Sequence, residues 1–308
     1  MFRMSRKHTR TTPSKNHNED KRGEPIALAD PEIGWTMKPG IYNYRAYSDD
    51  VPPIRATVLD DGRRAVSDIK NFSITDTDIL FVGCSYTFGY AISDHETMAW
   101  KLQARNPNLN ISNFGIAGSS PYQFSLLLKR VLPKIKSPKI VIYSYMGGHE
   151  IRNMSLPGWV RKSQNINFPY LDLDSENKIV KLKTRNVVNN PKDLVLYMLS
   201  SNVYYWIKEM FPGIKLKSRL IMTEVIKEMH ETSKQHGAKF YMVMLDDFED
   251  RVAYYRGVES RFGFKLVNCS APDRENMIVK NQGHPNGLQN SYWANCINEK
   301  IISQYTKR

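Results

Sequence analysis

The chain has 308 residues, of which 41% are hydrophobic and 11% aromatic, enough to build a sizeable core. Charged residues make up 24%, so the composition excludes a chain that is disordered throughout. The formal net charge of +13 favours a solvated basic surface, or attraction to an anionic partner such as acidic polysaccharide, nucleic acid or a membrane surface. No basic motif with interleaved aromatic residues indicates specific nucleic-acid binding.

The N-terminal part of the chain falls into two segments. Residues 1–25 are polar and basic and lack apolar periodicity, so we predict a disordered basic tail. Residues 26–77 include "DPEIGWTMKPGIYNY" and "VLDDGRRAVSD", whose glycine steps are typical of turns between short strands. They predict a small N-terminal β-rich extension.

Targeting signals and membrane spans are not indicated by the sequence. The N-terminus lacks the apolar stretch of a signal peptide, and the most apolar long segment, 194–207, is too short and too polar to span a bilayer. We therefore expect no membrane span, and a cytoplasmic location on the absence of a signal peptide.

From residue 78 to residue 308, apolar strand-like runs alternate with segments of helical periodicity. The expected strands are "DILFVG", "LNISNFGI", "KIVIYSYMG", "KFYMVMLDD" and "FKLVNCS". The expected helices are "HETMAWKLQARN", "PYQFSLLLKRVLPKIK", "KSRLIMTEVIKEMHETSKQHG", "DRVAYYRGVESRFG" and "GLQNSYWANCINEKIISQYTK". This alternation predicts an α/β domain with a mostly parallel sheet covered on both faces. Residues 151–190 read as an insertion with a hairpin after the third strand, and 191–212 as a helix over it.

The cysteines do not suggest a metal site or a crosslink. Cys84, Cys269 and Cys296 are far apart and form no C-x-x-C motif, so a zinc site is not expected. Their odd number predicts no disulfide framework, which suits a reducing compartment.

Two potential nucleophiles follow the first expected strand, in the stretch "FVGCSYTFGY". Ser85 lies where the chain must turn sharply from strand to helix, and Gly83 and Gly89 permit that turn. Ligands of parallel α/β sheets bind at the carboxyl ends of the strands, so Ser85 is a candidate catalytic residue. Cys84 is interpreted as a small packing residue. The pattern G-x-S-x-T-x-G differs from the G-x-S-x-G elbow of α/β-hydrolases.

Three further polar blocks belong to the same expected sheet edge. "NFGIAGSSPYQ" follows the second strand, "YMGGHEIRN" follows the third, and "NQGHPNGLQ" precedes the last helix. Together and in this order, the four blocks resemble the SGNH (GDSL-like) hydrolase family over residues 78 to 308. The resemblance implies a flavodoxin-like three-layer α/β/α sandwich and ester cleavage through an acyl-enzyme. It implies no metal and no organic cofactor.

The resemblance also assigns roles to individual residues. Ser85 matches the nucleophile of the family, and His284 matches the base that takes its proton. The backbone N–H groups of Ser85 and Gly118 match two donors of the oxyanion hole. His149 stands where the family has an asparagine that donates to the oxyanion, and Asn281 stands where it has the aspartate of the triad.

These two departures leave alternatives open. Asn281 can orient the histidine but cannot stabilise an imidazolium as a carboxylate does. Asp273 or Glu150 could supply that carboxylate, or the site could be a Ser–His dyad. His149 either donates to the oxyanion from a ring nitrogen or pairs structurally with Glu150 or Arg152.

The sequence therefore predicts a serine esterase-type hydrolase that cleaves an acyl ester. The polar insertion and the basic surface favour an O-acylated carbohydrate or another polar ester as substrate. The alternatives are an O-acyltransferase on the same scaffold and a catalytically weakened SGNH-like binding protein.

Overall fold

The computed structural model describes residues 26–44, 53–68, 72–154, 169–183, 212–246, 249–272, 275–280 and 282–306. The predicted tail at 1–25 and almost all of the helix predicted at 191–212 lie outside the described residues. None of the helices in the described ranges is both long and apolar enough to cross a membrane.

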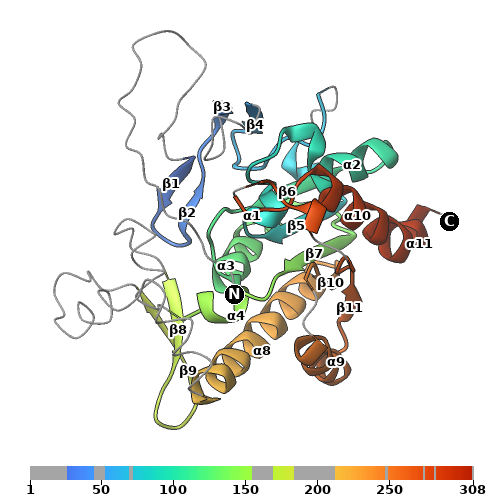
Figure 1. Ribbon diagram of the computed structural model, residues 1–308. Helices are drawn as coiled ribbons and strands as arrows, with labels where there is room; N and C mark the ends of the chain where they lie inside the picture. Colours follow the sequence, from blue (N-terminus) through green and yellow to red (C-terminus); the bar gives the residue numbers. More distant parts are fainter. Residues whose placement is uncertain are drawn as a thin grey trace.

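A five-stranded parallel sheet forms the centre of the molecule (Figure 1). Its strands are β5 (Ile79–Gly83), β6 (Ile111–Gly115), β7 (Ile140–Tyr145), β10 (Lys239–Met244) and β11 (Lys265–Asn268). The spatial order is β11-β10-β7-β5-β6, and every neighbouring pair is parallel. Numbered along the chain this is 2-1-3-4-5, the flavodoxin-like order, whose ligand site lies beside the first strand. The predicted α/β class is confirmed.

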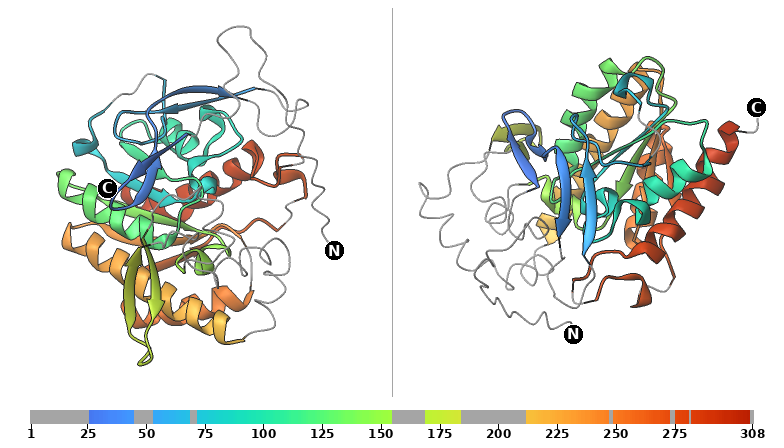
Figure 2. Two further views of the ribbon diagram at one scale, coloured as in Figure 1. Left: turned by 90° about the vertical axis from the view of Figure 1, so that its left-hand side faces the viewer. Right: turned by 90° about the horizontal axis from the view of Figure 1, so that it is seen from above.

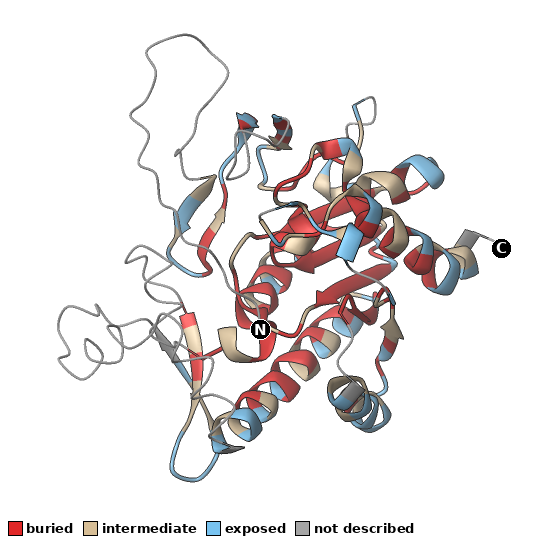
Figure 3. Cartoon of the chain, in the orientation of Figure 1, coloured by how far each residue is buried: buried red, intermediate tan, exposed pale blue. Residues whose placement is uncertain are grey.

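Helices cover both faces of this sheet and give three layers (Figure 2). The long helices are α2 (Met98–Arg105), α3 (Pro121–Val131), α8 (Pro212–Gln235), α9 (Glu249–Phe262) and α10 (Gly287–Ile297). Apolar side chains of α3, α8 and α9 join one core cluster, and those of α2 and α10 join the other. All residues of β5, β6 and β7 are buried as a result (Figure 3).

Short helical elements connect these layers. They are η1 (Ile74–Asp76), α1 (Ser85–Phe88), η2 (Asp94–Glu96), η3 (Leu132–Lys134), α4 (His149–Arg152), η5 (Glu275–Met277), the π-helical η6 (Asn298–Ile302) and α11 (Ser303–Thr306). Two of them, α1 and α4, directly follow β5 and β7 on the carboxyl side of the sheet.

The N-terminal segment forms two antiparallel hairpins, as its turn signals predict. They are β1 (Ala27–Asp30) with β2 (Gly34–Met37), and β3 (Gly40–Tyr44) with β4 (Ile54–Val58). Bridges from Val58 to Arg64 and from Arg64 to Asn113 join the second hairpin to the edge of β6. In the first hairpin, the Trp35 indole donates a hydrogen bond of 3.0 Å to the carbonyl of Ala117, just before α3. The extension therefore packs on the loop that follows β6.

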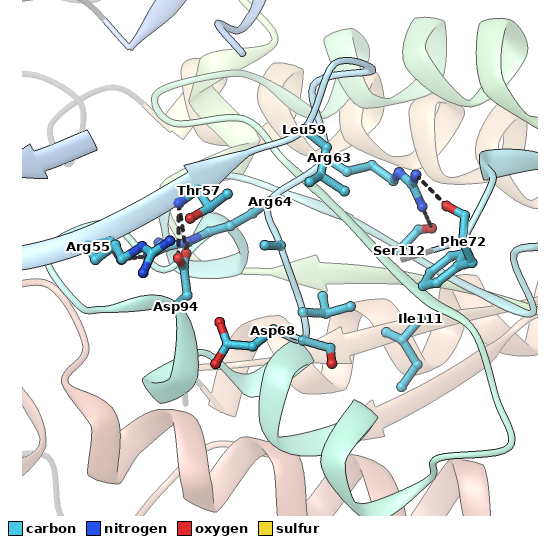
Figure 4. Close-up of a pocket in the computed structure, with 13 residues that line it drawn as sticks. Arg55, Thr57, Leu59, Arg63, Arg64, Asp68, Phe72, Asp94, Ile111 and Ser112 are labelled. Carbon is cyan, nitrogen blue, oxygen red and sulfur yellow. Dashed lines mark hydrogen bonds and ion pairs between the residues drawn. The ribbon is translucent and has the colours of Figure 1, made fainter. Parts of the chain in front are cut away.

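The buried side chain of Arg64 also fixes the chain that follows α1 (Figure 4). Its guanidinium donates to the carbonyls of Phe88, Gly89 and Ile92 and to the carboxylate of Asp94, which lies 2.8 Å away. Arg64 lines a cavity of about 210 Å³ beside β6. The carbonyls at the end of α1 have no partner within the helix, so this contact satisfies them.

The insertion after β7 contains an antiparallel hairpin, as predicted within residues 151–190. Its strands are β8 (Pro169–Leu173) and β9 (Ile179–Lys183). The hairpin is tied to α8 by an ion pair between Asp172 and Lys217 and by one of 3.7 Å between Lys181 and Glu228.

The expectation that no disulfide forms is wrong. Cys269 at the end of β11 is bonded to Cys296 in α10, with 5.8 Å between their Cα atoms, and Cys84 is free and buried. The two cysteines are brought together by the packing of α10 beside the sheet, which their sequence separation of 27 does not reveal. Structural disulfides persist in oxidising compartments, so the argument for a reducing compartment falls. The disulfide closes the segment that contains His284.

We expect the Cys269→Ser/Cys296→Ser double variant to unfold more easily than the parent, because the crosslink restricts the unfolded chain. The expected loss is about 3 to 4 kcal/mol of unfolding free energy, measured by urea denaturation without reductant. A reducing agent should bring the parent to the level of the variant and leave the variant unaffected. Equal midpoints for both proteins without reductant would contradict the crosslink.

Candidate active site

The turn from β5 into α1 is held in close contact with the sheet. A Cβ added at Gly115 of β6 would lie 2.2 Å from the backbone nitrogen of Phe88, and one at Gly83 would lie 2.0 Å from Oγ1 of Thr87. Both distances are shorter than any real contact, so a side chain at either glycine would push α1 off the sheet. The sharp turn expected around Ser85 is present, and Ser85 is the first residue of α1.

His284, from the C-terminal part of the chain, contacts Ser85. Its Nε2 atom lies 2.9 Å from Oγ of Ser85, across 199 residues of sequence. The loop between η5 and α10 holds the histidine: the Val279 N–H donates to the carbonyl of His284 at 2.7 Å, and the His284 N–H donates to Oε1 of Gln282 at 2.9 Å. This geometry allows the hydroxyl proton to pass directly to the imidazole.

Two tyrosine rings contact the imidazole of His284. The ring centroids of Tyr86 and Tyr90, both from the turn that carries Ser85, lie 5.7 Å and 5.2 Å from its centroid. Behind them, Trp293 of α10 lies 5.9 Å from Tyr86, and Tyr44 of β3 lies 6.1 Å from Tyr90. The two tyrosines that contact the histidine are therefore themselves packed against α10 and β3.

This environment keeps His284 neutral. Burial is the main cause that lowers the pKa of its imidazole from 6.5 to about 4, and the positive charge of Arg152 lowers it further, against a small opposing effect of Gln282. A neutral imidazole is the form that can accept the serine proton.

The carboxylate of a triad is not found among the described residues. Asn281 and Asp273 lie outside them, so their predicted roles stay predictions. Glu150 is described and buried. Its carboxylate accepts hydrogen bonds of 3.0 Å from the hydroxyls of Tyr145 and Tyr255, and it lies within 4 Å of two arginine side chains, Arg219 of α8 and Arg251 of α9. No hydrogen bond between described residues joins His284 to a carboxylate.

Two backbone N–H groups are available for an oxyanion. Gly118 lies in the loop between β6 and α3 and has a φ of 79°, in the left-handed region that favours glycine. Ser85 is at the start of α1, where N–H groups have no partner within the helix. Neither N–H is bound to another described residue. Their part in binding an oxyanion stays a prediction.

His149, the first residue of α4 after β7, is fully buried. Its Nδ1 lies 2.7 Å from the hydroxyl of Tyr143 and 3.4 Å from the backbone nitrogen of Met146, which can only donate. Nδ1 is therefore the acceptor and the proton is on Nε2. Burial is the main cause that lowers the pKa of His149, so the ring is neutral.

The Nε2–H of His149 is a buried donor without a partner among the described residues. Such a group costs free energy unless it binds something, which makes it a candidate for an oxyanion donor. No hydrogen bond joins His149 to Ser85 in the described part of the chain, so its place in the site stays a prediction. The described residues contain no group of three or more His, Cys, Asp or Glu side chains that could hold a metal ion.

Comparisons with known proteins assign neither a family nor an activity to this chain. No protein-family profile matches the chain, and no curated protein matches it. Among solved structures it is similar to TesA, with 13% identity and a TM-score of 0.44 over 73% of this chain and 98% of that one. It is also similar to the psychrotrophic esterase EstA from Pseudoalteromonas sp., with 11% identity and a TM-score of 0.45 over 76% and 100% of the two chains.

A third similar structure is a member of the lipolytic G-D-S-L family from Veillonella parvula, with 11% identity and a TM-score of 0.43 over 73% and 97% of the two chains. Likeness at this level assigns no activity to this chain.

The lowered pKa of His284 predicts an acid-tolerant catalyst. Because the pH profile of kcat/KM reports the pKa values of the free enzyme, its acidic limb should lie near pH 4. Below that pH the imidazole is protonated and cannot accept the serine proton. The pH–rate profile measures this, and the control variant His236→Gln, directly after the last residue of α8, should keep the limb in place. A limb at or above the ordinary histidine pKa would show that a carboxylate from outside the described residues contacts His284.

Proposed function

We propose that this protein is a serine esterase-type hydrolase that cleaves an acyl ester through an acyl-enzyme. The observation that carries the proposal is the 2.9 Å contact between Oγ of Ser85 and Nε2 of His284. It joins a hydroxyl at the carboxyl end of β5 to a neutral base, at the sheet edge where ligands of this fold class bind.

In the proposed reaction, Oγ of Ser85 attacks the ester carbonyl while His284 takes its proton. The oxyanion that forms is held by the N–H groups of Ser85 and Gly118 and by Nε2–H of His149. His284 then returns the proton to the departing alcohol, which leaves an acyl-enzyme on Ser85. Water, activated by the same histidine, releases the acid. Each donor aimed at the oxyanion is worth about 3 kcal/mol of transition-state stabilisation.

We favour a Ser–His dyad for this site. Nothing among the described residues supplies a carboxylate to His284, and Asn281 occupies the position where the family has one. The rings of Tyr86 and Tyr90 take over part of the orienting role, because both pack against the imidazole. Asp273 is the remaining candidate for completing a triad.

The substrate class that we propose is an acyl ester of a polar molecule, such as an O-acylated carbohydrate. The basic net charge of +13 and the polar insertion that contains β8 and β9 support a polar substrate. An O-acyltransferase would use the same nucleophile and base but pass the acyl group to a hydroxyl of an acceptor instead of water.

A serine-directed phosphonate and 4-nitrophenyl acetate test the proposal together. The parent should be labelled on Ser85 and should turn over the ester, and Ser85→Ala should lose both, with turnover falling by about 10³-fold or more. Ser260→Ala, at an exposed serine of α9, is the matched control and should behave like the parent.

Different outcomes separate the alternatives. Labelling without hydrolysis, with turnover restored by a sugar acceptor, would assign a transferase. A parent that is not labelled would indicate a binding protein. If Cys84→Ala lost turnover and Ser85→Ala kept it, the assignment of the nucleophile would be wrong.

A further inference from the structure

The loop between β6 and α3 carries Gly118, one of the two backbone donors proposed for the oxyanion. The N–H of Ser119 donates to the carbonyl of Ile116 at 3.2 Å, so residues 116–119 form a β-turn. Gly118, the third residue of this turn, has a φ of 79°, whereas Ala117, the second, is not among the residues with a positive φ. This combination defines a type II turn, whose third position favours glycine.

The central peptide of such a turn has two possible directions. Rotating it by half a turn converts type II into type I and leaves the ends of the turn in place, because the two types differ at ψ of the second residue and φ of the third. Glycine adopts either sign of φ, so the residue types of the turn do not fix the direction. Here the central peptide joins Ala117 to Gly118, and the flip would reverse the direction of the Gly118 N–H.

The N-terminal extension fixes the direction of this peptide. The indole N–H of Trp35 in β2 donates to the carbonyl of Ala117 at 3.0 Å, and it is the one donor to this carbonyl among the described residues. The peptide is trans, so its carbonyl and its N–H point in opposite directions. With the carbonyl bound to the indole, the Gly118 N–H points away from the extension. The bond to the carbonyl also polarises the peptide, which strengthens its N–H as a donor.

The hairpin that carries the indole is firmly packed. Trp35 is 5% exposed and Ile33 is fully buried. The carbonyl of Ile33 accepts a hydrogen bond of 2.7 Å from the side chain of Gln123 in α3. The turn is also joined to the strand that leads to the serine, because the Ile116 N–H donates to the carbonyl of Gly83 at 2.8 Å. The turn is therefore held by β5 at its first residue and by the extension at its central peptide.

We propose that Trp35 is a positioning residue of the esterase, which directs the Gly118 N–H at the oxyanion by binding the carbonyl of the same peptide. The proposal rests on the function proposed above and adds a residue from the N-terminal extension to its machinery. Acylation and deacylation both pass through an oxyanion, which is absent from the ground state. Loss of the bond from the indole therefore lowers kcat and kcat/KM together and leaves KM unchanged.

Trp35→Phe tests this, because it removes the donor and keeps an aromatic ring in the hairpin. We expect kcat for 4-nitrophenyl acetate to fall about 10-fold with KM unchanged, because the Ala117 carbonyl loses its partner and the flipped turn becomes accessible. The loss should stay below the roughly 100-fold or more that removal of an oxyanion donor costs. If circular dichroism shows that Trp35→Phe does not fold, benzothienylalanine at position 35, which keeps the shape of the indole and lacks its N–H, provides the same test.

Two further variants show whether Trp35 acts through the peptide of Gly118. Arg130→Gln removes the ion pairs of α3 with Asp30 and Glu32 of the same hairpin and leaves the indole bond in place, so it should keep the parent's kcat. Gly118→Ala disfavours the positive φ of the type II turn and should lower kcat by itself. Adding Trp35→Phe to Gly118→Ala should then cost little more, because both changes release the same peptide.

Four results would overturn the proposal and leave the esterase function intact. They are a parent-like kcat without the indole N–H, a raised KM with kcat unchanged, an equal loss of kcat in Arg130→Gln, and fully additive losses in the double variant of Trp35 and Gly118. The third would show that docking of the whole hairpin, and not the bond to the peptide, supports activity. A parent that turns over no ester at all and resists the phosphonate would overturn both proposals.

Discussion

The site depends on the close contact between α1 and the carboxyl ends of β5 and β6. Gly83 and Gly115 leave room for the backbone of α1 to lie directly on the sheet, where a single Cβ would overlap Thr87 or Phe88. This contact determines where Ser85 begins its helix. Arg64 holds the same helix from the other end, by binding the carbonyls of its last turn. The serine is therefore positioned by backbone packing.

The same turn also shapes the environment of the base. Tyr86 and Tyr90 follow Ser85 closely in sequence and lie against the imidazole of His284 in space, so nucleophile and base are aligned by one short segment. The cost of this arrangement is desolvation, which keeps the histidine neutral but opposes its protonation in the transition state. The field of Arg152 adds to that opposition.

The sequence predicts the fold well, because the information is local. Each apolar run of strand length became a strand of the parallel sheet, and the amphipathic segments between them became its helices. It also predicts the pair of Ser85 and His284, through the family resemblance that the four polar blocks carry. Contacts that arise only from packing are missed. The bond between Cys269 and Cys296 is one, because neither cysteine carries a local signal of its partner.

The environment of the base was missed for the same reason. The stretch "GCSYTFGY" does not indicate which part of the chain its tyrosines contact, and the histidine is about 200 residues away in sequence. The only sequence signal is that aromatic residues lie next to a candidate nucleophile.

The structure of a phosphonate adduct tests the central claim most directly. We predict phosphorus bonded to Oγ of Ser85, with its oxygen within hydrogen-bond distance of the N–H groups of Ser85 and Gly118 and of Nε2 of His149. An adduct on another residue, or an oxygen that points away from these donors, would contradict the account.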